Sequence, residues 1–241
     1  MKVKPYEKLA DVYRGLMKNV DYVKWSQYII EIAEDYINDE ASVLELASGN
    51  CKMAEMISSR FINFVGTDLS ISMLLSAESR EIKKICCNMT DLPLKIKFDF
   101  VFSAFDSVNY LLNRMELLRL FEEVYFVLED NGIFTFDVSL EKNSIRFLVE
   151  KNTEDYYDRF SFKRINQYNK RDKIHYNRFV ITHDSGTVVK ELHKQKIYDI
   201  GTYFKLAEQV GLITENCYDC FTFNDITSNS ERAQFILRKP T

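Results

Sequence analysis

The chain has 241 residues, of which 46% are hydrophobic, and its formal net charge is −4. This length allows one sizeable core with a small appendage, but not two full domains. Its 32 basic and 36 acidic residues are well mixed, which disfavours nucleic acid as a partner because phosphate binding needs a basic stripe. The sequence shows neither the apolar core of a signal peptide nor an apolar run that approaches the length of a membrane span, so it predicts a cytoplasmic protein without membrane contact.

The cysteines and histidines predict no metal site. Five cysteines, an odd number in a chain without a targeting signal, indicate reduced thiols. Cys217 and Cys220 have the spacing of a redox or metal pair, but no second cysteine pair or histidine cluster accompanies them, and a structural role is favoured. The three histidines, His175, His183 and His193, show no metal-ligand spacing.

Helical periodicity opens the chain, and strands alternating with helices follow. Apolar residues recur at helical spacing over residues 5–17 and 21–38, with Asp21 as the N-cap of the second helix. Short runs rich in Val, Ile and Phe predict strands at 42–46, 62–67, 83–87, 98–103 and 132–138, and helices at about 52–60, 71–80 and 114–128. The alternation predicts a parallel sheet with right-handed crossovers. Asn131-Gly132 is predicted to end the helix over 114–128 and to lead into the fifth strand.

The pattern changes after the fifth strand. Residues 155–197 alternate polar and apolar side chains around a Ser185-Gly186 turn, and they predict three antiparallel strands. Residues 199–210 return to a helix that Gly211 ends, and residues 212–219 and 232–238 predict a final antiparallel pair. The fold class is therefore α/β, with a small antiparallel β insertion.

Two strand ends carry the strongest functional signal. The first strand ends in a turn of small residues around Glu45, Ala47 and Gly49, and the second ends at Asp68. Small residues let the backbone approach a ligand, and an acid about twenty residues after such a turn accepts hydrogen bonds from ribose hydroxyls. Glu45 would repel a diphosphate and attract a cation, and the dehydrogenase fingerprint G-x-G-x-x-G is absent. An ordinary strand-to-helix turn and a helix cap at Asp68 are the alternatives.

Two later segments fit the same ligand. Asn88 and Met89, after the third strand, could hold a purine through its exocyclic amine and its face. Residues 103–110 follow the fourth strand, beyond the carboxyl end, where open parallel sheets bind ligands.

With these segments in order, the chain resembles class I S-adenosylmethionine-dependent methyltransferases of the bacterial small-molecule type. The core of the resemblance is VLELASGNCKMA (43–54), FVGTDLSISML (64–74), CNMTDLPL (87–94), FDFVFSAFDSVNYLL (98–112) and LEDNGIFTFDV (128–138). The resemblance extends over nearly the whole chain through YEKLADVYRGLMKNVDYVKW (6–25), which is similar to a helical cap, KELHKQKIY (190–198), which is similar to a β insertion, and RAQFILR (232–238).

The resemblance implies a Rossmann-like seven-stranded methyltransferase sheet, mostly parallel, with an antiparallel last strand. Residues 1–140 and 198–241 would form the cofactor-binding domain, with a helical cap over 1–38, and residues 141–197 would form a β insertion over the active site. The implied cofactor is S-adenosylmethionine. The implied partner is a small-molecule acceptor, with nitrogen favoured over oxygen, and the protein would be a monomer or a homodimer.

The resemblance also implies which residues meet the cofactor. These residues lie at strand ends or in the cap: Glu45, Ala47 and Gly49 at the methionine moiety, Asp68 at the ribose, Leu69, Asn88 and Met89 at the adenine, Ser103 with a carbonyl for the amino group, Tyr13, Tyr22 and Trp25 closing over the site, and Met73 in the same set.

Four residues depart from the family pattern, and one of them is Arg14, which stands where an acid often follows the cap tyrosine. Ala47 and Cys51 stand where the family usually has glycine, and Asn88 replaces the usual acid, although its amide oxygen can still accept from the adenine amine. The departures at Ala47, Cys51 and Asn88 support one alternative, a cofactor-binding protein without transferase activity. A nicotinamide-dependent oxidoreductase is a further alternative, weakened by the missing glycine fingerprint and the antiparallel end strand.

An amine acceptor must be neutral at attack, so a nearby base helps. Glu191, His193 and Gln195 share one face of a strand, and Glu191 could orient the ring of His193, which is the predicted base. Asp106 could hold the acceptor amine, and Tyr13 completes the predicted catalytic set. A solvated strand face, loop capping and core packing are the respective alternatives.

Overall fold

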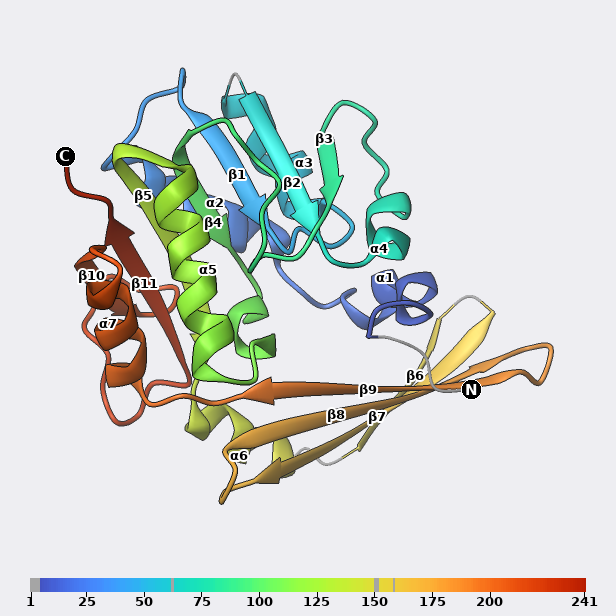
Figure 1. Cartoon of the computed structure of the whole chain (residues 1–241). Coiled ribbons are helices and arrows are strands. Elements are labelled where there is room, and N and C mark those ends of the chain that lie inside the picture. Colours follow the sequence, from blue (N-terminus) through green and yellow to red (C-terminus); the bar gives the residue numbers. More distant parts are fainter. Residues whose placement is uncertain (1–4, 62, 150–151, 158) are drawn as a thin grey trace.

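A seven-stranded sheet forms the centre of the computed structural model, which describes residues 5–61, 63–149, 152–157 and 159–241 (Figure 1). The strand order is β10-β11-β5-β4-β1-β2-β3. The strands are β1 (Ser42–Leu46), β2 (Asn63–Asp68), β3 (Lys83–Cys86), β4 (Phe98–Ser103), β5 (Leu128–Ser139), β10 (Ile213–Asp219) and β11 (Arg232–Arg238). The β1–β2, β1–β4, β2–β3 and β4–β5 pairs are parallel, and β11 pairs antiparallel with both β5 and β10. The predicted mostly parallel sheet with an antiparallel last strand is confirmed.

Helices cover both faces of this sheet and bury its apolar residues. On one face, α2 (Tyr22–Glu34) and α3 (Lys52–Ile57) pack together and enclose a core that contains Phe64, Phe100 and Phe102. On the other face, α5 (Arg114–Val127) and α7 (Ile200–Gln209) enclose the larger core (Figure 1). Such burial on both faces explains why the parallel strands are continuous apolar runs.

Several predicted bounds need correction. The helix predicted over 5–17 consists of two short pieces, η1 (Leu9–Asp11) and α1 (Tyr13–Leu16). The helix predicted over 52–60 is α3 followed by η2 (Ser58–Arg60), and α4 (Ile71–Leu75) ends five residues before the predicted end at 80. The first residue of the predicted second strand, 62, lies outside the described residues, as do residues 1–4, 150, 151 and 158 of the two expected domains.

Of two helix ends that the sequence predicts, the start of α2 is confirmed and the predicted end of α5 is wrong. Asp21 caps α2 as predicted, because its side chain accepts from Lys24 N at 2.9 Å. The Asn131-Gly132 prediction is wrong: α5 ends at Val127 and β5 begins directly at Leu128. Asn131 has a φ of 64° inside β5, next to an irregularity in the pairing with β4, so the turn residues mark a bulge within a strand.

A second, four-stranded antiparallel sheet follows β5 in the chain. Its order is β6 (Asn152–Tyr157), β7 (Phe160–Asn169), β8 (Ile174–His183) and β9 (Val188–Lys196). Three strands were predicted here, and this number is wrong because β6 and β7 form a tight hairpin across which the alternation continues. The preceding α6 (Glu141–Val149) was not predicted, because Asn143 and Ser144 occupy buried positions where the periodicity requires apolar residues.

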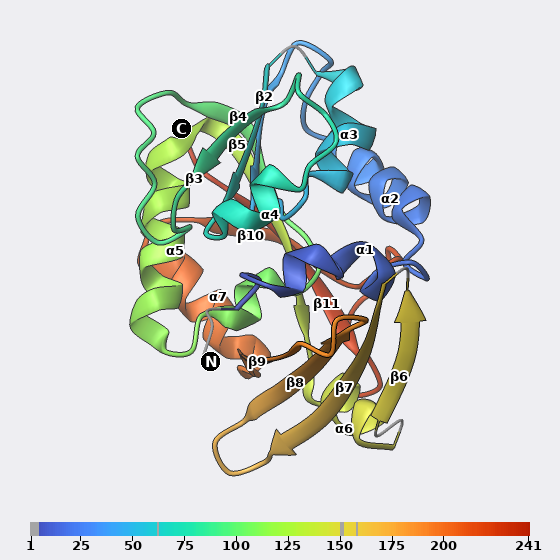
Figure 2. The same ribbon diagram turned by 90° about the vertical axis from the view of Figure 1, so that its right-hand side faces the viewer.

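The chain before α2 lies between the two sheets. We call residues 5–20 the N-terminal segment. In both views α1 is located between the β2–α4 edge of the large sheet and the β6–β9 sheet (Figures 1 and 2). The segment therefore lies beside the carboxyl ends of β1 and β2.

Candidate active site

The turn after β1 has an unusual backbone. Ala47, Gly49 and Cys51 have φ values of 54°, 57° and 58°, in the left-handed region that favours glycine. Ser48 fixes the turn to β2, because its N–H and its hydroxyl both donate to Thr67 O, at 2.8 and 3.2 Å. Two non-glycine residues in this conformation store backbone strain of a kind that concentrates at ligand sites.

Asp68 joins this turn to the end of β2. Its carboxylate accepts from Gly49 N at 2.8 Å and from Ser70 N at 2.7 Å, one bond to each oxygen. Burial raises the pKa of Asp68 although both N–H bonds lower it. A carboxylate has about four lone-pair sites, so Asp68 can still accept from ligand hydroxyls. Ser70, rather than Asp68, caps α4 through its hydroxyl, which accepts from Met73 N at 3.3 Å.

Glu45 provides a buried oxygen without a partner. The residue is 3% exposed, and within the described residues Oε2 has no hydrogen-bond partner. Burial, and then the nearby Asp68, raise the pKa of Glu45 well above its usual range. Burial and Glu45 also raise the pKa of Tyr22 to about 12. A buried carboxyl group with one unpartnered oxygen fits a cationic ligand group.

The residues predicted at the adenine differ in exposure. Leu69 is 72% exposed and Asn88 is exposed, while Met89 is half-buried against the larger core. The amide oxygen of Asn88 accepts from Thr90 N at 3.1 Å. Met73 is buried, and its Cε would lie 3.1 Å from a Cβ at Gly49, so Met73 packs beneath the turn.

Ser103 lies on the other side of β1. It is 1% exposed at the end of β4, and its Oγ is another buried oxygen that has no partner in the described part of the chain. Because β1 pairs with both β2 and β4, the ends of these three strands gather Glu45, Asp68 and Ser103 at one edge of the sheet.

The predicted polar row of β9 is buried, not solvated. Glu191, His193 and Gln195 are 3%, 0% and 8% exposed, and exposed residues alternate with them. His193 Nε2 lies 3.1 Å from Glu191 Oε2, and Nδ1 lies 3.0 Å from the hydroxyl of Tyr110. Burial raises the pKa of Glu191, but hydrogen bonds from His193 and from the N–H groups of Lys8 and Leu9 outweigh it and hold the pKa below its usual range.

Asp106 is already neutralised by neighbours. Its Oδ1 accepts from Arg232 Nη2 at 2.7 Å, and its Oδ2 accepts from the side chain of Gln195. Arg232 also pairs with Asp137, whose pKa burial raises to about 6 against the opposing effect of the guanidinium. Asp106 itself has a φ of 50° and its N–H donates to Asp137 at 2.8 Å. The structure therefore makes Asp106 part of a buried ionic cluster rather than a free acid.

The predicted cap aromatics take different positions. The ring of Trp25 lies 4.5 Å from those of Phe105 and Phe221, so it is part of the core beside the site. Tyr13 lies 5.9 Å, ring to ring, from Tyr6, and burial is the main cause that raises its pKa. Tyr6 was not predicted as a site residue.

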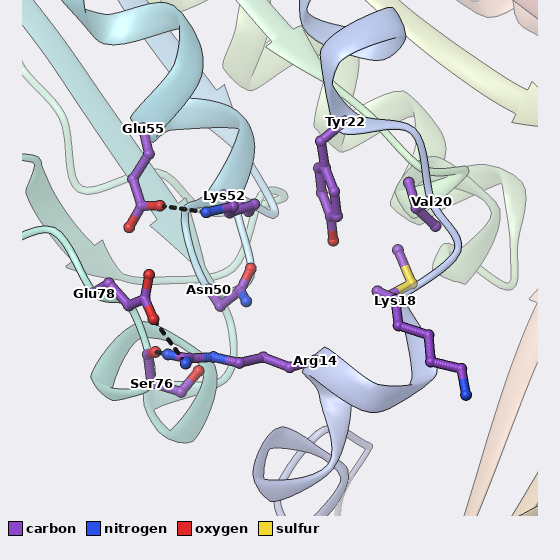
Figure 3. Close-up of a pocket in the computed structure, with 10 residues that line it drawn as sticks. Arg14, Lys18, Val20, Tyr22, Asn50, Lys52, Glu55, Ser76 and Glu78 are labelled. Carbon is purple, nitrogen blue, oxygen red and sulfur yellow. Dashed lines mark hydrogen bonds and ion pairs between the residues drawn. The ribbon is translucent and has the colours of Figure 1, made fainter. Parts of the chain in front are cut away.

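A pocket of about 210 Å³ opens beside the turn after β1 (Figure 3). Asn50 and Lys52 line it from the turn and α3, and Tyr22 lines it from α2. On the opposite wall, Arg14 Nη1 lies 2.7 Å from Glu78 Oε1 and joins the N-terminal segment to the residues after α4. The pocket therefore separates the N-terminal segment from the turn.

The described residues show neither a metal site nor a membrane-spanning helix. Within the described ranges, no group of three or more His, Cys, Asp or Glu side chains is arranged to hold a metal ion. Cys217 and Cys220 are free thiols, half-buried and buried. Among the described helices, none is long and apolar enough to cross a membrane.

Comparisons with known proteins agree with this geometry. Residues 43–132 match the family described as "Methyltransferase domain". The chain is 27% identical to the protein named "Putative methyltransferase GWCH70_2453" of Geobacillus sp. (strain WCH70), over 97% of this chain and 99% of that one. It is 24% identical to "Putative methyltransferase YqeM" of Bacillus subtilis (strain 168), over 97% of each chain.

Solved structures extend the likeness to the whole fold. An S-adenosylmethionine-dependent methyltransferase from Clostridium acetobutylicum matches with a TM-score of 0.79 and 25% identity, over 98% of this chain and 99% of that one. CalS10 from Micromonospora echinaspora, an amino pentose methyltransferase solved with S-adenosylmethionine bound, matches with a TM-score of 0.73 and 15% identity, over 99% and 98% of the two chains.

The fold is that of class I S-adenosylmethionine-dependent methyltransferases, and the relatives given above are named as methyltransferases. The chain is an enzyme of this class, and its cofactor is S-adenosylmethionine.

Proposed function

We propose that this methyltransferase acts on a small-molecule acceptor and that it favours nitrogen over oxygen. The observation that carries the proposal is the attachment of the N-terminal segment to β9. Buried Glu191 accepts from the N–H groups of Tyr6, Lys8 and Leu9 at 2.9, 2.7 and 2.8 Å. Ser70 Oγ donates to Tyr6 O at 3.0 Å on the other side. A site beneath such a strap admits a metabolite more easily than a macromolecule.

The strand-end residues fit the cofactor. Glu45, with its unpartnered buried oxygen, would meet the cationic methionine end, and Asp68 would accept from the ribose hydroxyls. Exposed Leu69 and Asn88 would flank the adenine, and Ser103 would meet the amino group. When bound, the cofactor supplies an activated methyl group on a sulfonium, so the protein's task is to align the acceptor and exclude water.

The second sheet would complete the acceptor side. We propose that residues 141–197 form a β insertion over the active site, with the buried row of β9 facing it. The row fits a nitrogen acceptor, because the imidazole of His193, paired with a carboxylate, can take the proton that a methylated amine releases. A hydroxyl acceptor also releases a proton, so the preference for nitrogen is supported by the structural neighbours instead. Two structural neighbours with this fold are a sugar N-methyltransferase, KedS8, and the amino pentose methyltransferase CalS10.

A paired acceptor screen tests this proposal. The protein is incubated with methyl-labelled S-adenosylmethionine and a panel of amino sugars, polyamines and amino acids, each beside the analogue with a hydroxyl in place of the amine. Total RNA and protein extracts serve as macromolecular acceptors, and Asp68→Ala is the control with impaired cofactor binding. We expect label on a small amine that its hydroxyl analogue does not receive. Label only on hydroxyl analogues or only on macromolecules would refute the proposal.

A further inference from the structure

Four side chains form a continuous hydrogen-bonded chain from the N-terminal segment to β9. Tyr6 Oη lies 2.8 Å from Tyr110 Oη, and Tyr110 Oη lies 3.0 Å from His193 Nδ1. His193 Nε2 lies 3.1 Å from Glu191 Oε2. The rings also pack together, with the centroids of Tyr6 and His193 4.6 Å apart at an interplanar angle of 89°.

Glu191 determines which group donates and which accepts in each hydrogen bond of this series. Its oxygens accept from Tyr6 N, Lys8 N and Leu9 N in addition to their contact with His193 Nε2. These donors outweigh the opposing effect of burial and favour the ionised carboxylate, which can only accept. The hydrogen of the neutral imidazole must therefore be on Nε2, and Nδ1 must be an acceptor.

This tautomer determines the direction of the hydrogen bonds that the hydroxyls of Tyr110 and Tyr6 make. Since Nδ1 accepts, Tyr110 must donate its proton to His193. Since the proton of Tyr110 is used, Tyr6 must donate to Tyr110. The remaining lone pairs of Tyr6 Oη are thus the accepting end of the whole chain.

This accepting end is on the less buried of the two end residues. His193 is 0% exposed, whereas Tyr6 is half-buried. Tyr6 is attached to both sides through its backbone: Ser70 Oγ, after β2, donates to Tyr6 O at 3.0 Å, and Tyr6 N donates to Glu191 of β9 at 2.9 Å. The residue therefore lies between the proposed cofactor side and the proposed acceptor side.

We propose that Tyr6 Oη receives the proton of the methylated acceptor and that the chain delivers it to His193. This inference rests on the proposed amine methylation. The acceptor nitrogen donates its lone pair to the methyl carbon, the carbon–sulfur bond breaks, and its electron pair stays on sulfur. The resulting N–H proton passes to Tyr6 Oη as Tyr6 gives its own proton to Tyr110, and Tyr110 gives its proton to His193 Nδ1.

The product on the protein side is an imidazolium stabilised by Glu191. Tyr6 is then the catalytic residue, because it touches the acceptor, while Tyr110, His193 and Glu191 act through it. Glu191 holds both ends of the chain, because it accepts from the backbone of Tyr6 and from the ring of His193. One carboxylate thus positions the proton's entry point and stabilises its final site.

The direction of the chain is testable without any acceptor. Nitrogen-15 NMR of the histidine-labelled protein at pH 7.5 reports the tautomer of each ring, and His193→Gln assigns the signal of His193. We expect a protonated Nε2 and an accepting Nδ1, with a change at Nδ1 in Tyr110→Phe. Tyr198→Phe is the matched control, since this buried hydroxyl donates to Leu111 O and is outside the chain. A proton on Nδ1, whether or not Nε2 is also protonated, would overturn the proposal.

Kinetics provide the second test, with an amine that the acceptor screen shows to be methylated. We expect Tyr6→Phe, Tyr110→Phe and His193→Gln each to lower kcat by about 10²-fold. KM should stay nearly constant, and the double variant Tyr6→Phe/His193→Gln should be no slower than either single variant. Additive losses, or full activity in Tyr110→Phe, would overturn the relay. Failure to find any amine acceptor would instead refute the proposed function, and the NMR result would still stand.

Discussion

At the ends of β1 and β4, the buried oxygens Glu45 Oε2 and Ser103 Oγ have no hydrogen-bond partner in the described residues. On β9, buried Glu191 instead accepts from three backbone N–H groups and contacts His193. The large sheet thus presents polar atoms that a ligand can satisfy, while the second sheet is already satisfied by the protein. In the proposed function, cofactor binding would use this vacant hydrogen-bonding capacity, and the acceptor side would be preorganised.

A substitution on β9, where the buried polar groups are hydrogen-bonded within the protein, should lower the free energy of unfolding the most. Glu191→Ala leaves one buried and two partly buried N–H groups and the buried ring of His193 without their acceptor, so we expect a loss of about 3 kcal/mol or more in the free energy of unfolding. Urea unfolding measures this loss. Glu122→Ala, an exposed position on α5, is the control and should change stability little. Equal stabilities of the two variants would show that the Glu191 network contributes nothing.

The same carboxylate predicts a pH dependence. Its hydrogen bonds hold the folded pKa of Glu191 below the usual range. The resulting stability is fully present above the unfolded pKa and is lost as the pH falls through the folded pKa. The stability gap between the wild type and Glu191→Ala should therefore narrow in acid. A gap that widens on acidification would contradict this assignment.

Substitutions on the proposed cofactor side should lower the affinity for S-adenosylmethionine. Asp68→Ala removes the bonds to Gly49 N and Ser70 N, and with them the acceptor that we propose for the ribose hydroxyls. We expect S-adenosylmethionine to bind about 2 kcal/mol more weakly, within the range of lost charge-assisted hydrogen bonds, as measured by titration calorimetry. Asp68→Asn keeps the shape and should lose most of the same affinity. Unchanged affinity in both variants would leave Asp68 with a purely structural role.

Substitution of Glu45 should change protein stability and cofactor affinity in opposite directions. Burial raises its pKa, so its contribution to stability is full below the unfolded pKa and is lost as the pH rises through the folded pKa. Glu45→Gln should therefore stabilise the ligand-free protein at neutral and higher pH, by about 1 kcal/mol, and weaken binding of the cationic cofactor. Thermal unfolding across pH, with and without cofactor, measures both effects. A destabilised Glu45→Gln protein at pH 8 would contradict the assignment.

The smallest effect concerns the strained turn. Ala47 has a φ of 54°, which glycine adopts without a Cβ clash. Ala47→Gly should raise the free energy of unfolding by about 0.5 kcal/mol, because relief of strain exceeds the added freedom of the unfolded chain. Cys51 has a similar φ but is fully buried, so Cys51→Gly should lower stability through lost packing. Urea unfolding compares the two variants, and a destabilised Ala47→Gly would show that the turn is unstrained.

The sequence predicts the large sheet well because its strands are local apolar runs. The observed bounds of β1, β4 and β11 are the predicted ones. The strand-end residues Glu45 and Asp68 are likewise visible in short motifs. Local signals of this kind survive without knowledge of the tertiary contacts.

The acceptor side could be predicted only in part. The common face of Glu191 and His193 follows from strand alternation, but whether it is buried does not. Tyr6 gave no signal, because its partners Glu191 and Tyr110 lie 185 and 104 residues away in the sequence. Contacts over such separations arise from the packing of the two sheets, which periodicity does not report.

The central claim is that the vacant oxygens at the ends of β1 and β4, together with Asp68, form the S-adenosylmethionine site. Titration calorimetry of the wild-type protein with S-adenosylmethionine, S-adenosylhomocysteine and NAD tests it most directly. The account predicts one molecule of either sulfur nucleoside per chain, with no binding of NAD, and competition between the two. Selective binding of NAD, or no heat with either sulfur nucleoside in protein freed of bound ligand, would contradict it.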